Sequence, residues 1–471
     1  MFYPLTKNAI HVYSITFTII LAMAVLFLLP ALINGFPLVF YDTDEYVYAA
    51  AHRYLPEDRP VYYSIFTMIF DLRRSPWPSV IFQSLVTAWV ICRFASTFFY
   101  ITSALRLLSL GFILTLGSSL PWFAGEIMPD IFTALMILAL ALLCLAVDTL
   151  PTSSAIMLVI LISASVGFHQ ANLLVALWLL PALGLCAVLG WRWSESLRYG
   201  ALASAIGLTL GTAALLTQNL IHHTFALSSG GSVILMARLL EDGTALSYLE
   251  DACPQQRFAV CALLDALKSE RAAIMSTTAP ETNLSDYFLW KGPLEKLGGF
   301  RAEAAEASTI VAGTLLTFPV AASRAAIDDG WRQMLKFRTG AELGPHRETD
   351  FVSVAIRDVF GPAVYKRYLK SQQIRGALYD QFNWINFIHS AVLAVSFLAL
   401  IGWFVVEGPR KQPRAFFACI FVIVSMVGNA FTLGGLSGPY DRYQARVIWL
   451  VPLLAGCLVL ALRPQRSEIE K

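Results

Sequence analysis

Charged residues are scarce in this chain. Only 14% of its 471 residues are Asp, Glu, Lys or Arg, whereas 57% are hydrophobic, and soluble domains carry nearer a quarter charged residues. Several apolar runs reach the ~20 residues that are needed to cross a bilayer. The sequence therefore predicts an all-α polytopic membrane protein that has the lipid bilayer as a partner. The net charge of +2 is too small to suggest binding to nucleic acid.

The chain also lacks the common cofactor and hydrolase motifs. It has no Gly-x-x-x-x-Gly-Lys-Ser/Thr loop, no Gly-x-Gly-x-x-Gly, no His-Glu-x-x-His and no Gly-x-Ser-x-Gly. The loops predicted to be cytoplasmic are too short for a nucleotide-binding domain. Direct use of ATP, NAD or a nucleotide sugar from the cytosol is therefore not expected, and the energy for any chemistry must arrive with a membrane-borne substrate or a gradient.

Cysteine is sparse, and most of it lies in apolar sequence. Two of the seven cysteines, Cys253 and Cys261, lie in a long polar segment, eight positions apart. A disulfide is plausible there if the segment is outside the cytoplasm, and two free cysteines on a helix are the alternative. No spacing resembles a zinc site. The other five are expected to pack as small hydrophobes: Cys92, Cys144, Cys186, Cys419 and Cys457.

Hydropathy predicts about ten membrane spans. They lie at roughly 11–33, 79–100, 105–121, 130–147, 153–168, 171–190, 199–218, 385–406, 415–433 and 446–462. With this count most basic residues near span ends fall on one side, and Lys and Arg are enriched in cytoplasmic loops. These residues are Lys7, Arg106, Arg192, Arg198, Arg410, Lys411, Arg414, Arg463, Arg466 and Lys471. Both termini are therefore predicted to be cytoplasmic.

The predicted topology divides the chain into three regions. Residues 1–218 form an N-terminal transmembrane module with an acidic first outer loop, and 385–471 hold the last membrane helices and a cytoplasmic tail. Between them, 219–384 form a long extracytoplasmic insert. Apolar residues recur at helical spacing in Met236–Leu249 and in Phe258–Leu267. We therefore expect the insert to be a mostly α-helical cap lying on the membrane surface.

An acidic cluster follows the first predicted span. Asp42, Asp44 and Glu45 lie at a membrane boundary, where carboxylates are costly unless they are solvated, paired or used. A carboxylate at the mouth of a helix bundle can act as a general base toward an acceptor hydroxyl or help to hold a divalent cation. The alternative is a solvated N-cap of a short surface helix that begins near Thr43.

Further acidic and imidazole groups are predicted on the same side of the membrane. Glu126 and Asp130 flank Pro129 at the head of a span. The alternative for Asp130 is that it simply faces the positive end of that helix. His169 lies between two spans. It is either a solvated turn residue or a hydrogen-bond donor to a phosphate or a sugar.

Two arginines stand at the outer entry to the last span. Arg442 and Arg446 are four positions apart, so they share one face of a helix. They are on the wrong side for the positive-inside rule, and arginine is suited to bidentate phosphate recognition. The alternative is pairing with a local acid such as Asp441.

The arrangement resembles the GT-C superfamily of integral-membrane glycosyltransferases. Asp44-Glu45-Tyr46, followed by Tyr48-Ala49, is similar to the acidic motif that follows the first helix in that family. Pro129-Asp130 is similar to the second acidic motif. Arg442-Tyr443, with Pro452 further on, is similar to the Arg-Tyr…Pro pattern of a late helix. The long outer insert before the last helices suits the cap region of the family. The resemblance covers mainly 11–218 and, loosely, 385–462, and the sequence of the insert 219–384 matches no known pattern.

The resemblance implies an inverting transfer of a sugar from a polyprenyl-phosphate donor to a glycolipid or polysaccharide of the cell envelope. Asp44 would be the general base, with Glu45 and Asp42 as the other catalytic candidates. Asp130 and Glu126 would orient the acceptor or, Asp130 together with Asp44, hold Mg²⁺ or Mn²⁺; no cofactor is certain. The remaining substrate-binding candidates are Tyr46, His169, Arg442, Tyr443 and Arg446, of which the arginines and His169 would bind the leaving phosphate.

The implied location is a bacterial inner membrane with the insert in the periplasm. Two other functions stay open at the level of sequence. A transporter or flippase of a lipid-linked glycan would also have many helices, but its ionisable groups are expected near the membrane midplane. A non-catalytic envelope assembly protein would use the insert for docking.

Overall fold

The computed structural model describes residues 7–192, 195–221, 225–277, 282–341, 343–406 and 412–461, with 7–15 and 195–196 as backbone alone. The described residues form helices joined by loops, as predicted, with no strand among them and one isolated β-bridge, between Leu38 and Glu126. The basic residues Arg410, Lys411, Arg463, Arg466 and Lys471, and the side chain of Lys7, lie outside the described part.

The N-terminal half is a bundle of long and short helices. In order they are α1 (Lys7–Phe27), α2 (Leu29–Asn34), α3 (Thr43–His52), α4 (Tyr62–Asp71), α5 (Trp77–Phe99), α6 (Ala104–Gly117), α7 (Leu120–Ala124), α8 (Ile131–Ala146), η1 (Val147–Thr149), α9 (Thr152–Phe168), α10 (Ala171–Leu177), α11 (Leu179–Val188) and α12 (Glu195–Ile221). The predicted first span, 11–33, is broken between α1 and α2. Pro30 explains the break, because its ring cannot continue the hydrogen bonding of α1.

The insert contributes short helices and the C-terminal region long ones. The insert holds α13 (Gly231–Asp242), α14 (Thr244–Ala252), η2 (Ala259–Leu263), α15 (Leu264–Ser276), α16 (Leu284–Trp290), α17 (Pro293–Lys296), α18 (Gly299–Thr317), α19 (Pro319–Leu335), α20 (Phe351–Phe360), α21 (Pro362–Tyr368) and η3 (Tyr379–Gln381). The last helices are α22 (Phe382–Val406), α24 (Pro413–Leu436), α25 (Asp441–Ile448) and α26 (Leu450–Ala461).

Seven of the ten predicted spans coincide with helices that are long and apolar enough to cross a membrane. Among the described residues these are Trp77–Phe99, Ile131–Thr149, Ala171–Val188, Leu197–Ile221, Tyr379–Val406, Pro413–Leu436 and Asp441–Ala461. The other three coincide with shorter apolar helices, Thr16–Phe27, Ala104–Gly117 and Thr152–Phe168. The chain is thus an integral membrane protein with several apolar helices, and the count of ten stays a prediction.

Helix α8 is the centre of the bundle. All 16 of its residues are buried, which explains why its sequence is apolar on every side. It packs against α5, α9, α12 and α24. Residues at the head of α8 are therefore held by a rigid, fully packed element.

The insert packs as two parts. Helices α13 to α18 share their own hydrophobic core, whereas α20 and α21 join the main core and α20 packs on α3. A disulfide joins Cys253 to Cys261, with a Cα–Cα distance of 5.7 Å. The predicted helix Met236–Leu249 is wrong as one element: Gly243, at φ +93°, separates α13 from α14.

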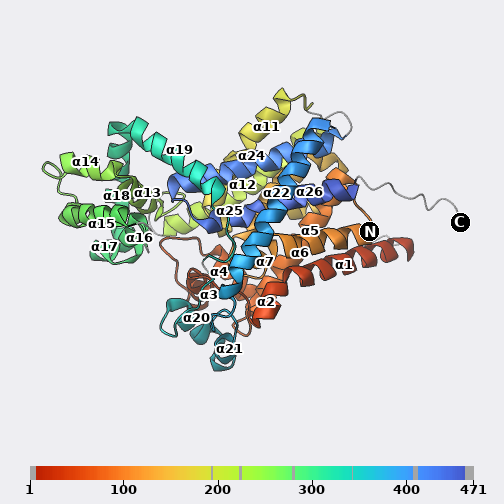
Figure 1. The fold of residues 1–471 in the computed structure, drawn as a ribbon, viewed down its shortest axis with the longest axis horizontal. Helices are drawn as coiled ribbons and strands as arrows, with labels where there is room; N and C mark the ends of the chain where they lie inside the picture. Colours follow the sequence, from red (N-terminus) through yellow and green to blue (C-terminus); the bar gives the residue numbers. More distant parts are fainter. Residues whose placement is uncertain are drawn as a thin grey trace.

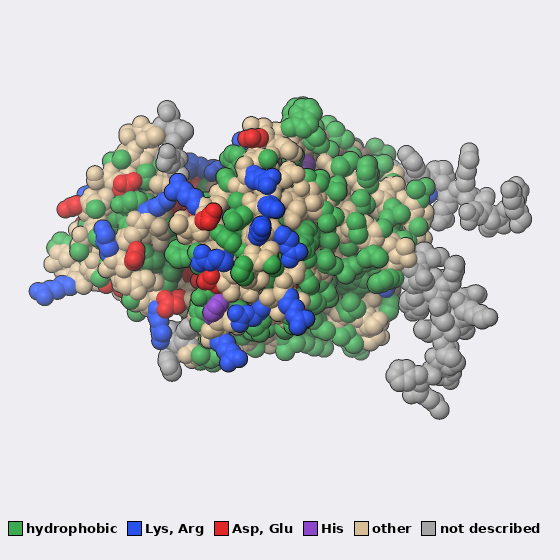
Figure 2. Space-filling view, turned by 90° about the horizontal axis from the view of Figure 1, so that it is seen from below, with side chains coloured by type: hydrophobic (Ala, Val, Ile, Leu, Met, Phe, Trp, Pro, Cys, Tyr) green, Lys and Arg blue, Asp and Glu red, His purple; other side chains and the backbone are tan. Residues whose placement is uncertain are grey.

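The molecule is polar at one end and apolar at the other. In Figure 1 the helices α13 to α18 gather at one end, and the start of α1 and the end of α26 lie at the other. Figure 2 shows that charged side chains gather on the insert side, whereas hydrophobic side chains cover most of the other half. This distribution is what a bundle in lipid with a water-facing cap requires.

Candidate functional site

Two loop segments that are far apart in sequence lie side by side. The Leu38 amide donates to the Gly125 carbonyl at 2.9 Å, and the Ile127 amide donates to the Leu38 carbonyl at 2.9 Å. The Thr43 hydroxyl donates to the Ile127 carbonyl at 3.1 Å and accepts from the Phe40 amide at 2.9 Å. These bonds join the acidic loop before α3 to the segment before α8.

Two buried glutamines hold this junction in place. The side-chain amide of Gln83, on α5, donates to the carbonyls of Ala124 (2.9 Å) and Glu126 (2.6 Å). Gln373 accepts from the Val39 amide at 3.1 Å and donates to the Val39 carbonyl at 2.6 Å. Buried backbone groups must be paired, and these side chains complete the pairing where no regular element can.

The junction brings Asp42 and Asp130 to the same arginine. Arg442 contacts Asp42 through Nη1 at 3.2 Å and Asp130 through Nε at 3.4 Å. Its guanidinium also lies over the Phe40 ring, 4.4 Å from the centroid. The sequence predicted these three groups on one side of the membrane, and the structure shows them in contact.

Arg59 is a member of this cluster that the sequence analysis missed. Its Nη1 lies 3.1 Å from Asp42 Oδ1, and its Nη2 lies 2.7 Å from Asp58. Its guanidinium lies 5.5 Å from the centroid of the Tyr46 ring. The outer loop 34–78 holds four arginines, Arg53, Arg59, Arg73 and Arg74, so the sequence alone did not single out Arg59.

Beneath the cluster lies a fully buried layer. Arg446 contacts Asp130 at 2.7 Å and donates to the Asn429 side chain at 3.2 Å. Asn429 in turn donates to the Tyr443 carbonyl at 2.7 Å. The side chains of Arg446 and Asp130 are 0% and 1% exposed. In this conformation they position Arg442 from below; direct phosphate binding by Arg446 stays a prediction.

The outward-facing part of the cluster is Asp42, Arg59 and Arg442. Their side chains are 26%, 14% and 13% exposed. Burial raises the pKa of Asp42, but Arg59 and Arg442 outweigh it and hold the pKa below its usual value. Asp42 is therefore ionised at neutral pH, and the group carries alternating charges at a partly open surface.

Asp44 and Glu45 lie one turn further along, at the start of α3. Burial raises the pKa of Asp44 to about 7, although its Oδ1 accepts from the Glu45 amide at 2.7 Å. Burial also raises the pKa of Glu45, whose carboxylate accepts from the Tyr54 hydroxyl. Arg59 and Asp42 are among the charges that act on Asp44. Asp44 can thus exchange a proton near neutral pH beside the arginine cluster.

His169, Tyr46 and Tyr443 border the same cluster. Burial lowers the pKa of His169 to about 3, so its ring is neutral. Its Nδ1 accepts from the Ala171 amide at 3.3 Å, which leaves the proton on Nε2 available for donation. Tyr46 is buried under Arg59. The Tyr443 ring lies 5.5 Å from Arg442 and 5.7 Å from Arg446.

Glu126 faces a hollow next to the cluster. Its side chain is buried, and the lining of the hollow includes aromatic, acidic and basic groups. The lining residues are Phe40, Trp122, Phe123, Glu126, Arg338, Thr339, Gly340, Ala341, Leu343 and Arg442. Arg442, which contacts Asp130, lines the same hollow, so Glu126 borders the cluster through this hollow.

The plainer alternatives for three of these residues, Asp42, Arg442 and Asp130, do not describe what the structure shows. Helix α3 does begin at Thr43, but Asp42 caps it with no side-chain hydrogen bond and pairs with the arginines instead. Arg442 forms ion pairs with Asp42 and Asp130, whereas the Asp441 carboxylate accepts from the Arg338 amide at 2.8 Å. Asp130 likewise makes no side-chain bond to its own helix.

The predicted divalent cation has a poor donor set at Asp130. No group of three or more His, Cys, Asp or Glu that could hold a metal occurs among the residues that the structure describes. Mg²⁺ and Mn²⁺ require anionic or neutral oxygens, whereas Asp130 is enclosed by Arg442 and Arg446. The residues present do not fit a cation between Asp44 and Asp130.

Comparisons with protein-family models, with curated proteins and with solved structures find no match for this chain. The site is therefore interpreted from its own chemistry.

Proposed function

We propose that this protein is a membrane glycosyltransferase that moves one sugar from a polyprenyl-phosphate donor to an envelope glycolipid or polysaccharide. The observation that carries the proposal is Asp44, a carboxyl whose pKa burial raises to about 7 and on which the charge of Arg59 acts. It lies two residues from Asp42, which pairs with both Arg59 and Arg442. Glycosyl transfer from a lipid phosphate needs these two parts: a base for the acceptor and fixed positive charge for the leaving group.

In the proposed reaction Asp44 takes the proton from an acceptor hydroxyl. The hydroxyl oxygen attacks the anomeric carbon, and the bond between that carbon and the donor phosphate oxygen breaks. The bond-forming and bond-breaking steps occur on opposite faces of the sugar, so the anomeric configuration inverts. Arg442 and Arg59 stabilise the departing phosphate. Their guanidinium groups contact Asp42 and the phosphate at the same time.

The other residues support this arrangement. Asp130, Arg446 and Asn429 hold Arg442 from the buried side. His169 is placed to donate a hydrogen bond from Nε2, and the hollow beside Glu126 and Trp122, of about 30 Å³, has room for a single hydroxyl group of the sugar. The proposed site lies outside the cytoplasm, in a bacterial periplasm, where a polyprenyl-phosphate donor brings the sugar without a cytosolic nucleotide.

The test is mass spectrometry of envelope glycolipids and polysaccharides from cells that carry wild type, Asp44→Asn or Asp328→Asn. The first change is nearly isosteric and removes the base. The second removes an exposed carboxylate on α19 and serves as the control. With equal protein levels, Asp44→Asn should remove one sugar-sized mass from a defined glycan. An unchanged profile would refute the proposal and favour a transporter.

A further inference from the structure

Two helices joined by a sharp bend, α18 and α19, connect the core of the insert to the membrane bundle. Helices α18 and α19 meet at 102°, with Pro319 at the start of α19. The outer stripe of α19 is Val320, Arg324, Ile327, Trp331 and Leu335. Its spacing of four, three, four and four residues places all five on one helical face. Val320, Ile327, Trp331 and Leu335 are 79%, 51%, 58% and 80% exposed.

The opposite face of α19 is fully used in packing on α24. Gly434 lies so close to the Asp329 carbonyl that an added Cβ would be 2.6 Å from the oxygen, and Gly330 is equally tight against the Phe431 ring. Gly435 lies against Ala326. Small residues allow this close approach of two helices. The exposure of the outer stripe therefore does not result from a loose attachment of α19 to the bundle.

Aromatic contacts place the stripe at the level of the membrane spans. The Trp331 ring lies 5.3 Å from Phe431, and Phe431 lies 6.4 Å from Trp178. Phe431 belongs to the span Pro413–Leu436, and Trp178 belongs to the span Ala171–Val188. The apolar stripe thus continues the surface that these two spans present to lipid.

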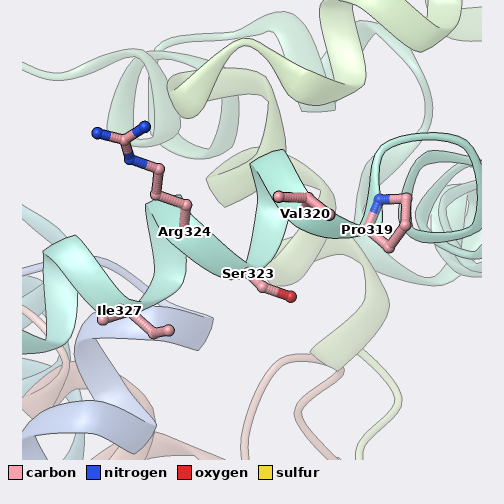
Figure 3. A pocket seen from close by; sticks show the side chains of 5 residues that line it. All are labelled: Pro319, Val320, Ser323, Arg324 and Ile327. Atoms are coloured by element: carbon pink, nitrogen blue, oxygen red, sulfur yellow. The ribbon is translucent and has the colours of Figure 1, made fainter.

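The first turns of α19 add a basic group to this surface. Figure 3 shows Pro319, Val320, Ser323, Arg324 and Ile327 around an open hollow, with the Arg324 guanidinium extended away from the helix. The adjacent exposed line of the helix is polar and carries Asp328 and Arg332. An apolar stripe with tryptophan and arginine beside a polar line is typical of helices that lie in a membrane interface.

We propose that α19 lies in the outer interface of the bilayer. The apolar residues of its outer stripe lie in lipid, and Arg324 lies on the phosphate of an anionic phospholipid headgroup. The outer stripe continues the apolar surface of α24 and α11, which favours the bilayer over a protein partner as what covers it. A cationic side chain near such a surface gains from anionic lipid. This placement is independent of the proposed glycosyl transfer.

The placement can be tested by spin labelling in reconstituted bilayers. A nitroxide is attached at Ile327→Cys on the stripe or at Asp328→Cys on the polar line. The free cysteines that the structure describes are all buried, and the unsubstituted protein gives the background. The ratio of accessibility to oxygen over accessibility to a water-soluble nickel chelate should be several-fold higher at 327 than at 328. Equal ratios at the two sites would overturn the proposal. High accessibility of both sites to the nickel chelate would mean that the stripe faces water. Exclusion of both reagents from site 327 would mean that a protein partner covers the stripe.

The headgroup contact has a separate test. Native mass spectrometry from mixed phosphatidylglycerol and phosphatidylcholine micelles compares wild type, Arg324→Gln and Arg332→Gln, the last being the control on the polar line. Loss of retained phosphatidylglycerol in Arg324→Gln alone is expected. Retention equal to wild type in Arg324→Gln, or equal loss in both variants, would overturn the assigned contact.

Discussion

At the scale of residues, the central feature is the carboxylate of Asp130, which contacts one partly exposed and one buried arginine. Asp130 joins the partly exposed Arg442 to the buried Arg446. Removing one partner of a buried ion pair leaves the other charge unpaired, which costs about 3–5 kcal/mol. We expect Asp130→Asn to lower the unfolding temperature in detergent substantially, measured by fluorescence-detected thermal unfolding.

A double variant separates the ion pair from other effects of that change. Asp130→Asn with Arg446→Met removes both members of the buried pair and replaces the arginine by an apolar chain of similar length. Its unfolding temperature should lie above that of Asp130→Asn alone, because the uncompensated buried charge is gone. A double variant that is less stable than both single variants would contradict the assigned pairing.

Asp44 provides a prediction about pH. Its pKa is raised to about 7, so the carboxylate that acts as base is formed only as the pH rises through that value. Transfer activity of reconstituted protein should therefore increase between pH 6 and pH 8. Asp44→Glu should keep a rising profile with a shifted midpoint, whereas Asp44→Asn should show no activity at any pH. A profile that is flat across this range would contradict the assigned role.

At the scale of elements, the insert clamps the loop that leads into the arginine helix α25. Gln333, on α19, accepts from the Tyr440 amide at 2.8 Å and donates to the Tyr440 carbonyl at 2.8 Å. The Tyr440 hydroxyl donates to Asp286 on α16 at 2.8 Å. The residue before Asp441 and Arg442 is therefore fixed by two helices of the insert.

This clamp predicts a local effect of Gln333→Leu. Loss of two hydrogen bonds from a buried amide costs about 1–3 kcal/mol, and the freed Tyr440 N–H should exchange with solvent faster. Hydrogen–deuterium exchange of 437–445 measures the effect, with Gln381→Leu, an exposed glutamine, as the control. Unchanged exchange in this segment would show that the insert does not hold α25.

The sequence predicted elements better than it predicted contacts. The apolar runs located the helices, and the acidic, proline and arginine motifs located the groups that meet at the site. Asp42 and Arg442 are 400 positions apart, so hydropathy could assign them only to one side of the membrane. The roles of Gln83, Gln373 and Asn429 depend on irregular backbone that pattern analysis does not resolve. Gln83 and Asn429 could have been noticed as amides inside apolar runs, whereas Gln373 lies in a polar segment and gives no such signal.

At the scale of the whole molecule, the open question is which end faces the cytoplasm. The insert carries the disulfide Cys253–Cys261, and disulfides persist in oxidising compartments. At the opposite end Arg414 pairs with Asp148 at 2.7 Å, near the basic connections predicted to be cytoplasmic. The disulfide favours the insert outside, and the ion pair shows that two connections predicted to be cytoplasmic lie at the same end of the bundle.

Two serine variants test this orientation in whole cells. Ser308 is exposed on α18 of the insert, and Ser103 is exposed at the start of α6 at the other end. A membrane-impermeant maleimide should label Ser308→Cys in intact cells and label Ser103→Cys only after the cells are opened. The buried native thiols keep the background low. Labelling in the reverse order would invert the topology and place Asp44, Arg59 and Arg442 on the cytoplasmic side, where a periplasmic acceptor could not reach them.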